Sequence, residues 1–418
     1  MQEERSPQAQ RWLRLAVLAW VVFSAALVVK ILAQGLDHSL YGDFVIGPRR
    51  WWAGLPMYDT LAYYYSPTFA VLFTPFAILP DWLGQTLWGL LSVWLLVWGL
   101  RVFYRDVLCW SSAFRLFRQG VAGSASSAEP IFLTLVLAAS ARGIWSLQSN
   151  AILMAGMLFG AAAVVRRQWW RAAFLLAAPV HIKLWPIVAG GLLSVLWPKK
   201  MIGRFAIACT ALAIIPFLTK APSEVISYYR SWTQRLIDRQ ATAQRFTGYR
   251  DAWTIWEQIH SPVDKQAYFV MTAAAGLAVL GWSLWLRHSR RTDCSDAEIV
   301  TYTLAAWASW QLLFGPGTER LTYLIIAPFA AWAVITSFLE HRHQWLGAAA
   351  FVTTFFLGAG FAERILVRIA PAAIALQPVG VILLAAWLTL HVASDKSWKK
   401  TATGTETPLE NPGSRLAA

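Results

Sequence analysis

Apolar runs alternate with short polar connections along most of the chain. Many of them approach the roughly 15 to 22 residues with which an α-helix crosses a bilayer. They lie near residues 12–33, 66–80, 83–104, 130–146, 150–165, 170–183, 184–197, 202–219, 266–287, 298–314, 322–339, 345–361 and 374–393. The pattern predicts an all-α polytopic membrane protein with about 11–13 transmembrane helices and with helices in its external loops. Their number stays open because the run at 66–80 is short and ends at Pro80, so it fits a re-entrant or tilted segment as well as a crossing.

The composition supports one membrane domain. Hydrophobic residues make up 57% of the chain and charged residues only 14%, whereas a soluble domain carries about 25% charged residues. This excludes a soluble globular protein. We predict a single transmembrane catalytic domain over residues 1–398, with external loops near 34–65 and 221–265. The polar residues 399–418 predict a disordered cytoplasmic tail.

The formal net charge of +14 would suggest a nucleic-acid partner in a soluble protein. Here the basic residues gather in short connections, which the positive-inside rule places in the cytoplasm; examples are Arg166, Arg167, Arg171, Lys199, Lys200, Arg204, Arg287, Arg290, Arg291, Lys396, Lys399 and Lys400. We therefore expect membrane lipids and no nucleic acid as partners.

The same rule predicts the topology. The N-terminus would lie in the cytoplasm, and residues 34–65, 221–265 and 315–321 would lie on the non-cytoplasmic side. The protein would be a multi-pass protein of a cell membrane such as a bacterial inner membrane.

The three cysteines, Cys109, Cys209 and Cys294, share no metal-binding spacing and indicate no disulfide framework. His181 lacks the HxxxH or HxxE partner of a metal site. We predict neither a metal nor a cofactor.

The candidate chemistry lies in polar clusters that this topology places on one side of the membrane. The first follows the first apolar run and contains Asp37, Asp43, Arg49, Arg50 and Asp59. The others are Gln148 with Asn150, His181 with Lys183, Glu319 with Arg320, and Arg250 in the loop at 221–265.

Each cluster taken alone has a plain structural explanation, such as a solvated loop acid, a snorkelling lysine or an interfacial aromatic belt. Together, however, they suit work on a lipid-linked sugar. Cations hold a phosphate, an acid takes a proton from a hydroxyl, and aromatic rings stack on sugar rings.

Three stretches carry a resemblance to a known family. These are GDFVIGPRRWWAGLPMYD followed by YYYSPTFAVLFTPFAILP, then SLQSNAILMAGMLFGAAAVVRR, and finally AAPVHIKLWPIVAGGLLSVLWPKK. In this order they resemble glycosyltransferase family 87 over roughly residues 12 to 340. Two departures stand out: Ser66-Pro67 replaces a Pro-Pro pair, and Glu319 with Arg320 stands where a histidine is expected.

The resemblance implies a C-type glycosyltransferase fold with an active site on the non-cytoplasmic face. It also implies transfer of a single sugar, typically mannose, from a polyprenyl-phosphate-linked donor to a lipid or glycan acceptor with inversion; the best-known members extend mycobacterial phosphatidylinositol mannosides. Asp43 takes the place of the family's general base. For substrate binding we expect Lys183, Arg250, Arg320, Glu319, Gln148, Asn150 and Tyr64.

Other functions remain open. A transporter or flippase of lipid-linked sugars would show internal repeats and matched broken helices, which the sequence lacks. A non-catalytic membrane scaffold would have little need for an acid after the first helix. A ligase that uses diphosphate-linked oligosaccharides is the remaining enzymatic alternative.

Overall fold

The computed structural model describes residues 7–60, 63–110, 125–241, 248–259, 264–289 and 294–394. Within these ranges all the regular secondary structure is helical, apart from one isolated β-bridge between Tyr249 and Glu319. The expected tail at 399–418 lies outside the described residues.

The helices follow the predicted apolar runs, with extra short helices between them. They are α1 (Pro7–Gln34), α2 (Tyr41–Trp52), α3 (Pro67–Ala77), α4 (Asp81–Asp106), η1 (Leu108–Trp110), α6 (Ala125–Trp145), α7 (Asn150–Val165), α8 (Trp169–Ile182), α9 (Pro186–Leu196), α10 (Pro198–Ile214), η2 (Ile215–Leu218), α11 (Pro222–Ala241), α12 (Ala252–Gln258), α13 (Lys265–Ser289), α14 (Asp296–Phe314), η3 (Arg320–Ile326), α15 (Ala327–Leu339), α16 (Gln344–Val352), the π-helix η4 (Thr353–Leu357), α17 (Gly360–Ile369), η5 (Pro371–Ala375) and α18 (Leu376–Ser394).

Seven helical segments of the described chain are long and apolar enough to cross a membrane; they run over Pro7–Gln34, Asp81–Asp106, Ala128–Trp145, Pro198–Leu218, Lys265–Ser289, Arg320–Leu339 and Pro371–Ser394. An eighth crossing would come from Gln344–Leu357 together with Gly360–Ile369, if these two segments, bent by 84° relative to one another, form one broken span. Shorter apolar helices such as α7 and α9 belong to the same bundle. The protein is therefore an all-α polytopic membrane protein, as predicted.

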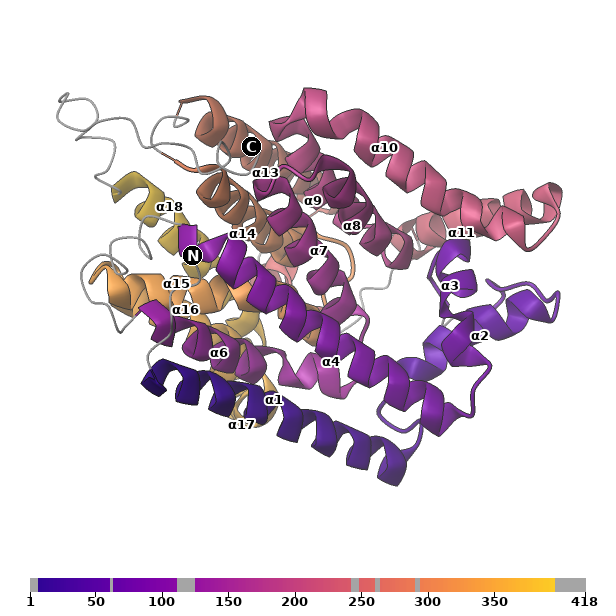
Figure 1. The fold of residues 1–418 in the computed structure, drawn as a ribbon, viewed down its shortest axis with the longest axis horizontal. Helices are drawn as coiled ribbons and strands as arrows, with labels where there is room; N and C mark the ends of the chain where they lie inside the picture. Colours follow the sequence, from indigo (N-terminus) through magenta and orange to yellow (C-terminus); the bar gives the residue numbers. More distant parts are fainter. Residues whose placement is uncertain are drawn as a thin grey trace.

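Helix α4 connects two opposite ends of the bundle. Its first residue, Asp81, pairs with Arg49 of α2 at 2.5 Å, and its last residue, Asp106, pairs with Arg166 after α7 at 2.5 Å. We call these the Asp43 end and the Asp106 end. Figure 1 shows α2, α3 and α11 gathered on the right, beyond the ends of the long helices α1 and α4.

The ambiguous run at 66–80 forms α3, a helix of 11 residues and hence about 16 Å in length, which is too short to cross a bilayer. The side chain of Ser66 caps it by accepting a hydrogen bond from the Phe69 N–H at 3.1 Å. At its other end, Arg49 donates to the Ala77 carbonyl at 3.2 Å. Both α3 and the start of α4 thus lie at the Asp43 end, and only α4 runs through the bundle within 66–104.

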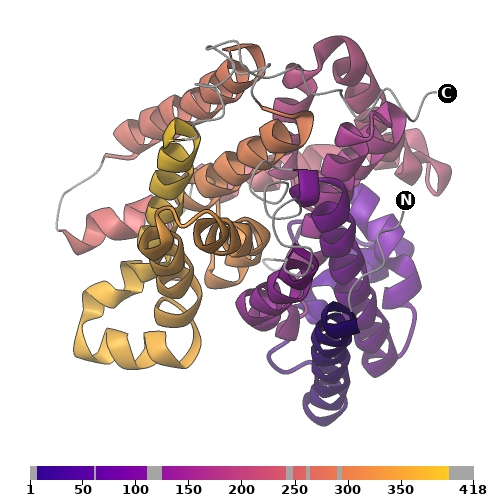
Figure 2. The same cartoon turned by 60° about the vertical axis from the view of Figure 1, so that its left-hand side comes forward.

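The two halves of the chain flank the region that holds the polar clusters. In Figure 2 the N-terminal helices, indigo to purple, lie on the right, and the C-terminal helices, orange to yellow, lie on the left. Helices α6 and η3 approach closely at Gly143, where a Cβ atom would lie 3.2 Å from Leu324 and 3.3 Å from the Leu321 carbonyl. This glycine lets the last turn of α6 reach the start of η3.

Candidate active site

The turn at 315–321, which follows α14 and includes the first two residues of η3, links the polar clusters. Gly317 has φ of +68°, a conformation that side chains disfavour. The Thr318 hydroxyl donates to the Gln311 carbonyl at 3.2 Å, and the Thr318 carbonyl accepts from the Arg250 N–H at 2.7 Å. The turn is thus fixed to α14 on one side and to the segment before α12 on the other.

Asp43 lies in the first turn of α2 and is half-buried. The position is fixed by the backbone, because the Asp43 N–H donates to the Leu40 carbonyl at 3.2 Å and the Leu40 N–H donates to the Ser146 carbonyl at 3.1 Å. Burial raises the pKa of Asp43 above its ordinary value, and the negative charge of Glu319 raises it further. Two carboxylates from distant parts of the chain therefore act on one another, which favours proton acceptance by Asp43.

Lys183 reaches the same turn through an amide. It follows α8 in an extended conformation, and its Nζ donates to Asn150 Oδ1 at 2.9 Å and contacts Gln148 Oε1 at 3.5 Å. The Asn150 amide in turn donates to the Leu321 carbonyl at 3.2 Å. The predicted residues Gln148, Asn150 and Lys183 therefore form one network at the Asp43 end.

Arg250 and Arg320 meet at a carboxylate that the sequence did not indicate, Glu363 of α17. Arg250 Nη2 donates to Glu363 Oε1 at 3.1 Å, Arg320 Nη1 lies 3.2 Å from Oε2, and Arg142 Nη1 from the end of α6 lies 3.9 Å from Oε2. The side chains of Arg250 and Glu363 are each 2% exposed, whereas those of Arg320 and Arg142 are 33% and 40% exposed. Arg320 thus offers the more accessible guanidinium of the two predicted arginines.

Arg250 is held from several directions. It donates from Nη1 to the Tyr249 carbonyl at 2.9 Å, and its own carbonyl accepts from the Tyr323 hydroxyl at 2.8 Å. Burial lowers the pKa of its guanidinium, and the nearby Arg320 lowers it further. Arg250 is therefore a fixed part of the scaffold that carries Arg320.

The remaining residues singled out at the Asp43 end are Tyr64, Asp37 and Asp59. The Tyr64 ring stacks beneath the guanidinium of Arg235 in α11 at 5.0 Å, and its carbonyl accepts from Trp232 Nε1 at 3.0 Å. These contacts tie it to α11. Asp37 and Asp59, the other two acids of the first polar cluster, are exposed.

The sequence patterns did not indicate Glu363 or Arg142 as site residues. Arg142 falls inside a predicted apolar run, and Glu363 follows the run at 345–361 that was expected to be a simple crossing. A signal was present in GFAERILVRI, residues 360–369, because Phe361, Ile365 and Ile369 recur at a helical spacing beside charged residues. This pattern is typical of an amphipathic helix at a membrane surface.

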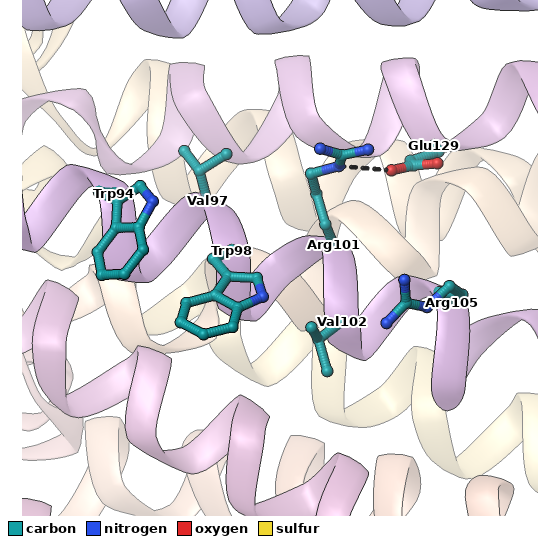
Figure 3. Close-up of a pocket in the computed structure, with 7 residues that line it drawn as sticks. All are labelled: Trp94, Val97, Trp98, Arg101, Val102, Arg105 and Glu129. Atoms are coloured by element: carbon teal, nitrogen blue, oxygen red, sulfur yellow. Dashed lines mark hydrogen bonds and ion pairs between the residues drawn. The ribbon is translucent and has the colours of Figure 1, made fainter.

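A separate cavity of about 390 Å³ lies toward the Asp106 end of α4 (Figure 3). It is lined by Trp94, Trp98, Arg101, Arg105 and Glu129 among others, and Arg101 Nε donates to Glu129 Oε1 at 3.1 Å. This cavity and the Asp43 cluster occupy opposite ends of the bundle, so it is not part of the candidate site.

Comparison with protein families matches residues 63–316, more than half of the chain, to glycosyltransferase family 87. The chain belongs to glycosyltransferase family 87. No curated protein matches it. The matched range includes Tyr64, Lys183 and Arg250, whereas Asp43 precedes it and the 319–321 part of the turn follows it.

Membership makes this protein a membrane glycosyltransferase. The resemblance inferred from the motifs is thereby confirmed at the level of the family. The clustering of acids and cations at one end of a family 87 protein makes the Asp43 end the candidate active site.

Proposed function

We propose that the enzyme transfers a single sugar, mannose, from a polyprenyl-phosphate-linked donor to a hydroxyl of a lipid or glycan acceptor on the non-cytoplasmic face. The observation that carries this proposal is the 315–321 turn of a family 87 protein, which holds Arg320 against Glu363, accepts the Asn150 amide that binds Lys183, and carries Glu319, whose charge raises the pKa of Asp43. The pair, Asp43 and Glu319, suits the acceptor hydroxyl. Arg320 and Lys183 suit the donor phosphate.

The chemistry needs little covalent help from the protein, because the phosphate is already a leaving group. The acceptor oxygen attacks the anomeric carbon from the face opposite the phosphate and forms the new glycosidic bond. The bond from that carbon to the phosphate oxygen breaks, and its electron pair leaves with the phosphate. Asp43 takes the hydroxyl proton as general base, and the configuration of the anomeric carbon is inverted.

Cations fixed near the leaving phosphate favour this step. Negative charge grows on the phosphate as the bond breaks, and preorganised positive groups outside bulk water stabilise developing charge most effectively. Arg320 is positioned by Glu363, and Lys183 is positioned by Asn150. Neither side chain has to move in from solvent when the bond between the sugar and the phosphate breaks.

A transfer assay tests the proposal. Purified enzyme is supplied with radiolabelled mannose on a polyprenyl phosphate, with the glucose equivalent, or with a nucleotide-linked mannose, together with a lipid acceptor extract. We expect label to move only from a polyprenyl phosphate, and the product to have the opposite anomeric configuration. Transfer from the nucleotide alone, or of a whole oligosaccharide from a diphosphate carrier, would contradict the proposal.

The orientation in the membrane is a separate prediction. The Asp106 end carries the basic connections near Arg166, Lys199 and Arg287, which supports a cytoplasmic position for this end. In a variant without Cys109, Cys209 and Cys294, we expect Ala53→Cys to react with an impermeant maleimide in intact cells. Lys199→Cys should react only after the cells are permeabilised. The reverse pattern would place the Asp43 end in the cytoplasm.

A further inference from the structure

The buried carboxylate of Glu363 takes no part in the transfer step, yet three guanidinium groups converge on it. They come from α6, from the segment before α12 and from the start of η3, in Arg142, Arg250 and Arg320. Glu363 itself lies on α17, beyond the 84° bend and outside the residues matched to the family. The cluster therefore joins the C-terminal helices to the candidate site.

Only one of the two oxygens of the Glu363 carboxylate accepts a hydrogen bond from the described residues. Oε1 accepts a hydrogen bond from Arg250, but Oε2 is enclosed and accepts none from the described residues, although Arg320 and Arg142 lie within ion-pair distance. Arg142 Nη1 is likewise enclosed without an acceptor in the described part of the chain. Buried donors without acceptors are costly. Among the described residues the cluster thus holds one unpaired acceptor, Glu363 Oε2, and one unpaired donor, Arg142 Nη1, and an anion bound beside the arginines would supply an acceptor for this donor.

The net charge of the cluster around Glu363 also favours binding of an anion. The four ion-paired groups, three guanidinium groups and one carboxylate, together carry a charge of +2. In a polyprenyl-phosphate donor the phosphate is a diester with one negative charge. After transfer it is a monoester, which carries about 1.5 to 2 negative charges near neutral pH. The surplus therefore matches the departing phosphate better than the intact donor, and this difference favours the transition state.

We propose that Glu363 is a resident counter-anion of the phosphate site: it positions Arg250 and Arg320 when the site is empty and competes for Arg320 with the phosphate lipid left after transfer. This inference rests on the function proposed above. Glu363 is a positioning residue because it acts through the arginines. Its competition weakens the hold on the product, so that the lipid phosphate leaves and a new donor enters.

The first test is a binding measurement that needs no turnover. Glu363→Gln keeps the size of the side chain and removes its charge. Glu224→Gln is the matched control, because Glu224 also pairs with a basic residue, Lys220, but lies on α11 with its side chain 41% exposed. The ligand is farnesyl phosphate, a short polyprenyl monophosphate without sugar, with farnesol and inorganic phosphate measured alongside to separate the lipid from the phosphate.

We expect Glu363→Gln to bind farnesyl phosphate more tightly than the native enzyme and to bind farnesol equally, since only the phosphate competes with Glu363. Without ligand its Tm should fall, because the arginines repel one another, and saturating farnesyl phosphate should restore much of the loss. Glu224→Gln should match the native enzyme throughout. A glutamate with a merely structural role would lower Tm equally with and without the ligand.

Kinetics give a second readout. In Glu363→Gln we expect kcat to fall about ten- to a hundredfold, the size expected when a hydrogen bond between charged groups is lost, while product inhibition by the polyprenyl phosphate becomes stronger. Glu363→Asp keeps the charge and should recover part of kcat. Unchanged or weaker binding of farnesyl phosphate to Glu363→Gln would overturn the proposal.

The outcomes separate the two proposals. If Glu363→Gln binds farnesyl phosphate more tightly but the native enzyme transfers no sugar from any polyprenyl phosphate, the counter-anion stands and the proposed reaction fails. If transfer occurs and binding is unaffected by the substitution, the reaction stands and the counter-anion fails. Should Glu363→Gln not fold alone, purification with farnesyl phosphate should rescue it, and failure of that rescue also counts against the proposal.

Discussion

Replacing Asp43 by asparagine is expected to lower the turnover of the enzyme by about 10²- to 10⁴-fold, the usual contribution of a general base. The substitution preserves the shape of the side chain but removes the group that accepts the proton of the acceptor hydroxyl. Asp43 lies on α2 at the end of the bundle that also carries the cation cluster, and it is half-buried. Its loss should leave expression and Tm nearly unchanged. Steady-state kinetics with purified enzyme and a lipid-linked donor measure the effect.

The rival acids provide the controls. Asp37→Asn and Asp59→Asn remove exposed carboxylates from the same stretch and should leave turnover close to the native value. Glu319→Gln removes the carboxylate whose charge acts on Asp43 and should have a smaller effect than Asp43→Asn. If Asp43→Asn transferred sugar normally and Glu319→Gln did not, the base would belong to the 315–321 turn.

The acid side of the pH profile should carry the signature of this pair. Burial and the charge of Glu319 both raise the pKa of Asp43. Only the ionised carboxylate accepts a proton, so activity is lost as the pH falls through this raised pKa, at a higher pH than for an ordinary aspartate. Glu319→Gln removes one cause of the shift and should move this limb to lower pH. A limb that stayed in place would show that another group controls it.

The polar clusters were predictable because the chain offers few places for them. Between long apolar runs, a charged residue must lie at a membrane face, so Asp43, Lys183 and Glu319 had only two possible ends to occupy. The basic connections, assigned to the cytoplasm, then predicted that they share the other end. The structure adds how they meet: Lys183 reaches the turn through Asn150, and the charge of Glu319 acts on Asp43.

Glu363 could not be placed in the same way. Hydropathy is averaged over a window of residues, so the apolar run at 345–361 predicts one straight crossing. Such an average does not reveal the bend after η4. Whether the next ten residues lie against Arg250 depends on tertiary packing over more than one hundred residues of sequence. Helices were expected in the loops between the apolar runs, but the bounds of α11 were not predictable for a related reason. Its sequence, PSEVISYYRSWTQRLIDRQA, is largely polar, and a search for membrane-spanning apolar runs passes over such a helix.

Arg320→Ala is the second change with a large expected effect. We expect kcat to fall by about 10²- to 10³-fold, the range found when one group that stabilises a developing negative charge is removed. Arg320 is the accessible member of the cluster: its side chain is 33% exposed and lies 3.2 Å from Glu363. Arg250→Ala, in contrast, should lower Tm as well, because the Arg250 side chain is buried and its loss leaves the buried Glu363 carboxylate without its hydrogen-bond donor.

Two further variants separate charge from geometry at this position. Arg320→Lys keeps the positive charge but loses the planar fork that binds two phosphate oxygens at once, so it should recover only part of the lost turnover. Arg368→Ala removes an exposed arginine of α17 and should leave kcat and the donor KM unchanged. The substitutions at Arg320 should also weaken binding of farnesyl phosphate, opposite in sign to Glu363→Gln. Equal loss of activity in Arg320→Ala and Arg368→Ala would mean that general surface charge, and not a phosphate site at the turn, supports the reaction.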